Sequence, residues 1–298
     1  MKCSQWNAML FLFVVALHLA GNCGSAAILS NFEGGATDYD SAAAQTTGKF
    51  RDTASGPFIN ISSNGSGNDF LSFTNTGGNR PSTVYDLSPS NTSPYSLFLT
   101  PVGLTTQITV DVQFPSSTLT FFTLGILDPT AGTTNRGVAF EFRDQAGATQ
   151  DQIALRYLPP ASGEGIQTPG ADIQVLTNTG SAVVNPIIRM TLNFLNNGSS
   201  ATITGNATTI SALEGTVGAT LATLTPQTIN YGTGAGQLNL SPATSGFEIL
   251  LGRNNSGVTD VVRADLLTLT VVPEPGSFSM MLFASVMLWA VRRKRIVA

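Results

Sequence analysis

The sequence feature that most constrains the fold is a period of two residues, in which apolar and polar side chains alternate through one segment after another. Residues 105–114 show it most clearly. Their apolar side chains are Ile108, Val110, Val112 and Phe114, and the polar ones between them are Gln107, Thr109, Asp111 and Gln113. Successive side chains of a β-strand point to opposite faces, so this alternation predicts a strand with one buried face. Residues 187–195 repeat the pattern.

Many other short segments alternate in the same way or are apolar on both faces, and no segment between 27 and 272 shows a sustained helical period. The strands expected are 28–32, 58–61, 69–74, 82–87, 95–100, 105–114, 119–127, 138–143, 153–158, 187–195, 201–205, 247–252 and 261–272. Residues 119–127 are apolar on both sides, as in a central strand. Asn196-Asn197-Gly198 predicts a hairpin turn between two of the strands.

Short strands separated by Gly, Asn and Pro turns, without an internal repeat, predict an all-β fold. The architecture expected is a two-sheet antiparallel sandwich, jelly-roll-like in type. Residues 28–272 are expected to form it as one domain, since sandwiches of about 200–250 residues often fold as a single unit.

The charge of the chain is unevenly distributed and excludes two kinds of partner. Only 11% of the 298 residues are charged, and between 27 and 276 there are 18 acidic residues against nine basic ones, a net charge of −9. An acidic body repels nucleic acid and anionic lipid surfaces, so neither is expected to bind it.

Cysteine and histidine occur only near the N-terminus. Cys3, Cys23 and the single histidine, His18, all lie within the first 27 residues. If those residues are removed, no thiol or imidazole remains, which excludes Ser-His-Asp and Cys-His catalysis and zinc sites built on these side chains.

Residues 1–27 have the pattern of a secretory signal peptide. Lys2 precedes an apolar stretch at 8–20, and small residues at 24–27 provide the cleavage site, which is expected after Ala26 or Ala27. Signal peptidase is therefore an expected partner. A lipoprotein signal at Cys23 is the alternative, but Ala20 and Asn22 do not provide the residues expected before a lipidated cysteine.

The C-terminal residues 273–298 combine an extended segment, an apolar run and a basic end. Pro273, Glu274 and Pro275 precede the apolar residues 277–291, which are followed by Arg292, Arg293, Lys294 and Arg295. Fifteen helical residues rise roughly 22 Å, so this helix would span a bilayer only marginally. Four consecutive basic residues resist translocation, which places the C-terminus in the cytoplasm and residues 28–272 outside it.

The Pro273-Glu274-Pro275 motif, the short apolar helix and the basic end together resemble the PEP-CTERM sorting signal of Gram-negative bacteria. The resemblance covers less than a tenth of the chain. It implies a transient anchor in the inner membrane, recognition by an exosortase, and release or transfer to the envelope, the cell surface or the exopolysaccharide matrix. An ordinary single-pass anchor is the alternative. The strand spacing of residues 28–272 also resembles concanavalin-A-like jelly rolls, on general pattern alone.

No catalytic residues are predicted. Jelly-roll glucanases resemble this chain in pattern, but they carry Glu-x-Asp-x-x-Glu on one strand, and Glu141-Phe142-Arg143-Asp144 is the nearest match here. On a regular strand Glu141 and Asp144 would face opposite sides. The interpretation favoured over catalysis is an exposed Glu141–Arg143 pair on the solvent side.

Candidate binding residues remain for sugars and for calcium. Aromatic rings that stack on sugars, with polar neighbours, make Tyr157, Arg156 and Tyr231 candidate glycan-binding residues, with Tyr85 and Tyr95 as further candidates by type. The alternative is that these tyrosines cap the edge of the core. Residues Asp38 and Asp40 are candidate Ca²⁺ ligands, although the pair equally fits an ordinary acidic loop; no other cofactor is expected.

Two hypotheses of function follow. The first is an exported, non-catalytic surface or matrix protein with a structural or glycan-associated role, and exopolysaccharide as a candidate partner. The second is a carbohydrate-active enzyme, a glycoside hydrolase or lyase, whose carboxylates come from distant strands.

Overall fold

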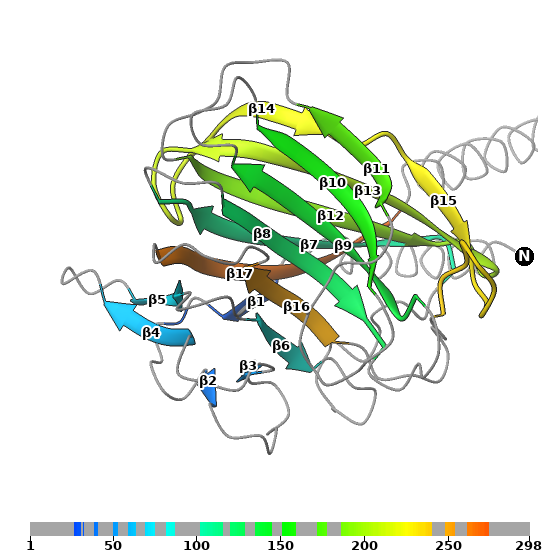
Figure 1. The fold of residues 1–298 in the computed structure, drawn as a ribbon, viewed down its shortest axis with the longest axis horizontal. Coiled ribbons are helices and arrows are strands. Elements are labelled where there is room, and N and C mark those ends of the chain that lie inside the picture. The colour runs from blue at the N-terminus through cyan, green and yellow to red at the C-terminus, as the bar shows by residue number, and fades with distance from the viewer. Residues whose placement is uncertain are drawn as a thin grey trace, which may run out of the picture.

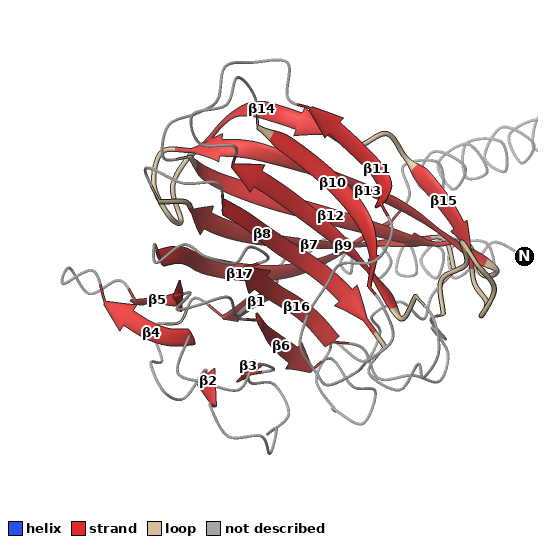
Figure 2. Ribbon diagram, in the orientation of Figure 1, coloured by secondary structure: helices blue, strands red, loops and turns tan. Residues whose placement is uncertain are grey.

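The computed structural model describes the strands of the chain and the tighter turns between them. The described residues are 27–30, 32, 39–40, 50–52, 59–63, 69–74, 82–86, 102–115, 120–128, 135–144, 151–158, 172–177, 186–239, 248–253 and 261–273. Within these residues every regular element is a β-strand, as Figure 2 shows. The expected strand 95–100 and the leader up to residue 26 lie outside them.

The strands form two layers (Figure 1). Within the described residues, the first layer, sheet A, is a path of seven strands with two more attached, β1 to β17 and β15 to β13. In spatial order the seven are β14 (Val217–Thr223), β13 (Ser200–Ile210), β12 (Ile187–Asn196), β7 (Leu104–Gln113), β17 (Val261–Pro273), β5 (Asp69–Thr74) and β4 (Ile59–Ser63); the two attached strands are β1 (Ala27–Ser30) and β15 (Gln227–Asn230).

The second layer, sheet B, has eight strands within the described residues. Their order is β11 (Asp172–Thr177), β10 (Gln152–Leu158), β9 (Gly137–Asp144), β8 (Thr120–Leu127), β16 (Glu248–Arg253), β6 (Ser82–Asp86), β3 (Phe50–Asp52) and β2 (Tyr39–Asp40). All paired strands of both sheets are antiparallel except β2 and β3, which are parallel. The predicted two-sheet antiparallel sandwich is therefore confirmed.

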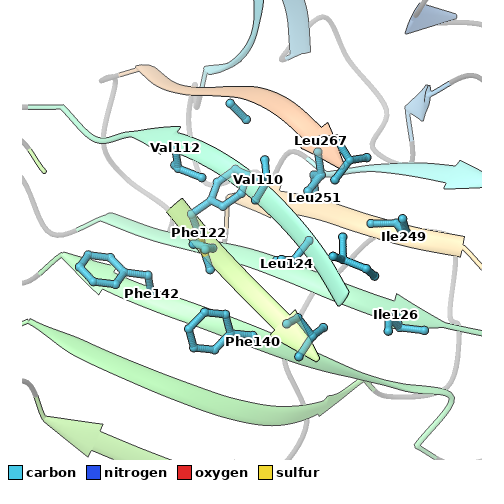
Figure 3. Packing of buried hydrophobic residues seen from close by; sticks show 14 of the residues in the cluster. Val110, Val112, Phe122, Leu124, Ile126, Phe140, Phe142, Ile249, Leu251 and Leu267 are labelled. Atoms are coloured by element: carbon cyan, nitrogen blue, oxygen red, sulfur yellow. The ribbon is translucent and has the colours of Figure 1, made fainter. Parts of the chain in front are cut away.

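One hydrophobic core fills the space between the sheets (Figure 3). The alternating apolar residues of β7 face those of β8 and β9, and Phe122, Phe140 and Phe142 are fully buried. Aromatic rings from the two layers meet directly: Phe73 lies edge-on to Phe122 at 5.3 Å between centroids. Burial of each such side chain contributes about 1.5–3 kcal/mol, so the core is the main force that holds the layers together.

Strand positions and the hairpin turn agree with the sequence where the alternation is strong. The β5 strand occupies residues 69–74 as expected, and β9 pairs with β10 in register from Gly137–Leu158 to Arg143–Gln152. The predicted hairpin joins β12 to β13, with Gly198 at a φ of 88°, a value that suits glycine. Five strands were not expected: β2, β3, β11, β14 and β15.

Candidate functional site

A cluster of four charged side chains lies on the outward face of sheet B, the side away from the core. Arg143 Nε contacts Glu141 Oε1 at 2.6 Å, and Arg156 Nη1 lies 3.6 Å from the same oxygen. Arg156 Nε and Arg143 Nη2 reach Asp172 Oδ1 at 2.6 and 3.5 Å. Each carboxylate thus meets both guanidinium groups, and the cluster has no net charge.

The expectation that Glu141 and Arg143 form an exposed pair is wrong for Glu141, whose side chain is 1% exposed. Strand alternation gave the face correctly but could not show that this face is covered. Beside the cluster, Leu127, Ala139, Leu158 and Leu250 form a second, smaller apolar group that is also buried. A carboxylate that is 1% exposed and in contact with two guanidinium groups cannot reach the proton of a bound substrate, so it is poorly placed to act as a general base.

Asp144 and Asp151 flank the connection between β9 and β10, and both are buried, at 2% and 0% exposed. Strand alternation places Asp144 on the core side, opposite to Glu141. Burial, and secondarily the charge of Asp151, raises the pKa of Asp144 from 3.8 to about 7. Asp144 and Asp151 are thus a pair of carboxyl groups, one of which has a raised pKa. Glycosidase chemistry, however, needs two carboxyl groups that flank a bound substrate, and these two are buried away from solvent.

We expect the pKa of Asp144 to make stability depend on pH. The folded state holds a proton that the unfolded chain releases near pH 4, so this contribution is present below pH 4 and is lost as pH rises towards 7. The loss should amount to roughly 2–4 kcal/mol in the free energy of unfolding. Urea unfolding at pH 5 and pH 8 measures it, with Asp144→Asn as the comparison.

The Asp144→Asn variant carries no titratable group at this position, so its stability should change less between the two pH values than that of the unmodified protein. Asp151→Asn should reduce the difference without abolishing it, because burial remains the larger cause of the shift. Equal pH dependence in the unmodified protein and in Asp144→Asn would contradict the assignment.

Two of the candidate glycan-binding residues, Arg156 and Tyr157, lie on opposite faces of β10. Arg156 belongs to the charge cluster on the outward face of β10, whereas Tyr157, the next residue, faces the core side and donates a hydrogen bond to the Gly236 carbonyl at 2.9 Å. Tyr231 donates to Asn196 Oδ1 at 3.2 Å and packs against the core. Burial raises the pKa of both tyrosines.

The remaining candidate residues fall partly or wholly outside the described part of the chain. Tyr85 lies in β6 and Asp40 in β2, but their side chains are not described, and Tyr95 and Asp38 lie outside the described residues. Among the described side chains, no three of His, Cys, Asp or Glu gather as metal ligands would.

Of the predicted sorting residues, Pro273 is the last residue of β17, where it pairs with Leu104 of β7. Glu274, Pro275 and the basic residues Arg292, Arg293, Lys294 and Arg295 lie outside the described residues, as does the apolar run 277–291. In the part of the chain that is described, no helix is long and apolar enough to cross a membrane.

A second buried ion pair, on the outward face of sheet A, was not anticipated. Arg189 donates to both oxygens of Asp111, from Nε at 2.6 Å and from Nη2 at 2.9 Å, and the backbone N–H of Glu214 donates to Asp111 Oδ2 at 2.9 Å. The hydrogen bond to Asp111 is the main reason why the pKa of Arg189 lies above its ordinary value. Asp111 is 0% exposed and ties β7, β12 and the β13–β14 turn together.

Comparison with known proteins gives a distant similarity of structure only. No protein-family model matches the chain, and no curated protein is similar to it in sequence. The winged bean acidic lectin aligns with 84% of this chain and 98% of its own, at 10% identity and a TM-score of 0.42. A Bacillus licheniformis β-glucanase aligns with 83% and 97%, at 11% identity and a TM-score of 0.37.

Proposed function

We propose that this chain is an exported, non-catalytic protein of the cell surface or matrix of a Gram-negative bacterium, delivered through its C-terminal PEP-CTERM-like tail. The observation that carries the proposal is the pairing of the first and last strands. β1 pairs antiparallel with β17, with Ala27 opposite Leu269, so β1 begins and β17 ends at the same end of sheet A.

This arrangement suits a protein that is anchored at both ends before processing. Ala27 adjoins the expected signal-peptide cleavage site, and Leu269 lies four residues, about 13 Å along the strand, before Pro273. Both apolar terminal segments would then leave the sandwich on its membrane side, and the folded domain could stay intact while each is removed. Signal peptidase and an exosortase-type enzyme are the partners that this proposal requires.

The alternative, a glycoside hydrolase or lyase, is supported less well by the described residues. It needs two accessible carboxyl groups on either side of a bound sugar. Asp144 and Asp151 are buried, and Glu141 is held between two arginines. A binding or structural role needs no such pair.

The proposal is tested by the intact mass of the protein recovered from the envelope and medium of producing cells. We expect an N-terminus at residue 27 or 28 and a C-terminus that lacks Arg292 to Arg295. Replacement of Glu274 and Pro275 by alanine should leave the tail attached and the protein in the membrane fraction. Recovery of the surface protein with a C-terminus at Ala298 would overturn the proposal.

A further inference from the structure

The outward face of sheet A carries mostly uncharged polar side chains over four neighbouring strands, β17, β7, β12 and β13. Cross-strand register aligns them in rows: Thr268, Thr109, Thr191 and Asn206 form one row, and Thr270, Gln107, Asn193 and Thr204 the next. Thr105 and Thr202 belong to a third row, which also contains the apolar residues Leu195 and Val272. We call the ten polar residues of these three rows the polar face.

Hydrogen bonds between neighbouring strands hold several side chains of the polar face in place. Gln107 Nε2 donates to Asn193 Oδ1 at 2.9 Å, and Asn193 Nδ2 donates to Thr204 Oγ1 at 3.1 Å. The hydroxyl groups of Thr109 and Thr268 also form a hydrogen bond with each other. A ligand that meets side chains already ordered in this way loses less conformational entropy on binding. Amides and hydroxyls can each make further hydrogen bonds beyond these.

Strand propensity explains only part of this composition. Threonine is favoured in strands, and the open face of an antiparallel sheet is normally polar. None of the ten side chains is charged, in a chain of which only 11% of the residues are charged. The nearest charges lie in the next row along the strands, where Asp111 and Arg189 neutralise each other beside Asp265. Gln107, Thr109, Asn193, Thr204 and Thr268 are all partly exposed.

We infer that the polar face binds an extended, neutral polysaccharide, an inference that rests on the proposed surface or matrix function. Sugar hydroxyls both donate and accept, as the amides and hydroxyls of this face do. Threonine methyl groups add apolar contacts for the C–H faces of the sugar rings. Adjacent strands lie about 4.8 Å apart, so a sugar chain laid across them would meet a polar group on each strand.

Other classes of ligand fit this face less well. An anionic polymer would find no unpaired cation among the ten residues and would approach a body of net charge −9. A peptide that adds a strand needs a free sheet edge, whereas all four strands of the polar face are paired on both sides. Since none of the ten residues is aromatic, affinity should depend on many weak contacts and should rise with the length of the sugar chain.

The experiment uses the protein recovered from cells and measures its co-sedimentation with amorphous cellulose, a neutral polysaccharide, and with alginate gel, an anionic one. We expect binding to cellulose that exceeds binding to alginate. The triple variant Thr109→Val, Thr204→Val and Thr268→Val keeps shape and strand propensity but removes three hydroxyls, and it should bind cellulose at least about tenfold more weakly.

The matched control changes three exposed threonines that lie outside the strands, Thr216, Thr225 and Thr233, to valine and should bind as the unmodified protein does. Circular dichroism checks that both variants are folded. No binding to cellulose, equal binding by the triple variant, or stronger binding to alginate would overturn the inference. The mass of the same sample separates the two proposals, because a processed protein that does not bind would leave the proposed function standing.

Discussion

Replacement of Asp111 by alanine is expected to lower the free energy of unfolding by about 3–4 kcal/mol, because the partners of a buried carboxylate would lose their acceptor. Arg189, whose side chain is 23% exposed, would lose both of its bonds to Asp111, and the Glu214 amide would lose its bond as well. Glu214 has a φ of 57°, which is costly for a residue other than glycine, so the turn depends on this contact. The effect should therefore extend to the β13–β14 turn.

The Asp111→Asn variant separates charge from shape. Asparagine keeps a hydrogen-bond acceptor of similar size, and it removes the negative charge that faces Asp265 in the neighbouring strand. We therefore expect a smaller decrease in the free energy of unfolding, about 2 kcal/mol. Urea unfolding followed by circular dichroism measures both variants, since Trp6 and Trp289 lie outside residues 28–272 and give no signal from the sandwich. Gln113→Ala, which removes only an exposed contact with Arg263 at 3.3 Å, is the control. A loss below about 1 kcal/mol for Asp111→Ala would show that the pair does not hold the turn.

Apolar residues, alternating or in continuous runs, predicted the strands that are buried on one or both faces, such as β7, β8 and β16. Strands that are mostly exposed or very short were missed. β14 is exposed along most of its length at the edge of sheet A, so nothing selects a buried face in its sequence. β2, β3 and β15 are too short for a period of two to be recognised. The strands that position the core were therefore predictable, whereas the edges of the sheets were not.

The candidate site was less predictable because alternation gives the face of a side chain but not what covers it. Glu141 was assigned to the correct side of its strand, yet its burial depends on neighbours from other strands. Asp172, which completes the charge cluster, lies on β11, a strand that was not predicted. Asp111 was placed among polar residues, but its contact with Glu214 joins positions 103 residues apart in sequence. Such contacts arise from topology and leave no local pattern.

The Glu141→Ala variant is expected to cost about 3 kcal/mol in the free energy of unfolding, since it leaves two guanidinium groups at the covered face of sheet B. Arg143 and Arg156 are 13% and 19% exposed, so water can replace the carboxylate only in part. Asp172, which is 41% exposed, lies 2.6 Å from Arg156 but 3.5 Å from Arg143, so it would compensate one arginine better than the other. Glu141→Gln keeps an acceptor and should cost about half as much.

Variants of Asp172 test whether burial of the carboxylate determines how much each ion pair of this cluster contributes to stability. Asp172 contacts the same two arginines as Glu141, but it is 41% exposed against 1% for Glu141, so Asp172→Asn should lower the free energy of unfolding by less than about 1 kcal/mol. A cycle of Glu141→Gln, Arg156→Met and the double variant measures the coupling between the two side chains, which we expect to exceed that between Asp172 and Arg156. Equal decreases in the free energy of unfolding for Asp172→Asn and Glu141→Gln would mean that burial does not strengthen the ion pairs with the arginines. A larger loss of unfolding free energy for Glu141→Gln would instead mean that Glu141 stabilises sheet B. A catalytic carboxylate commonly lowers the stability of its protein, so its replacement would not be expected to destabilise the fold in this way.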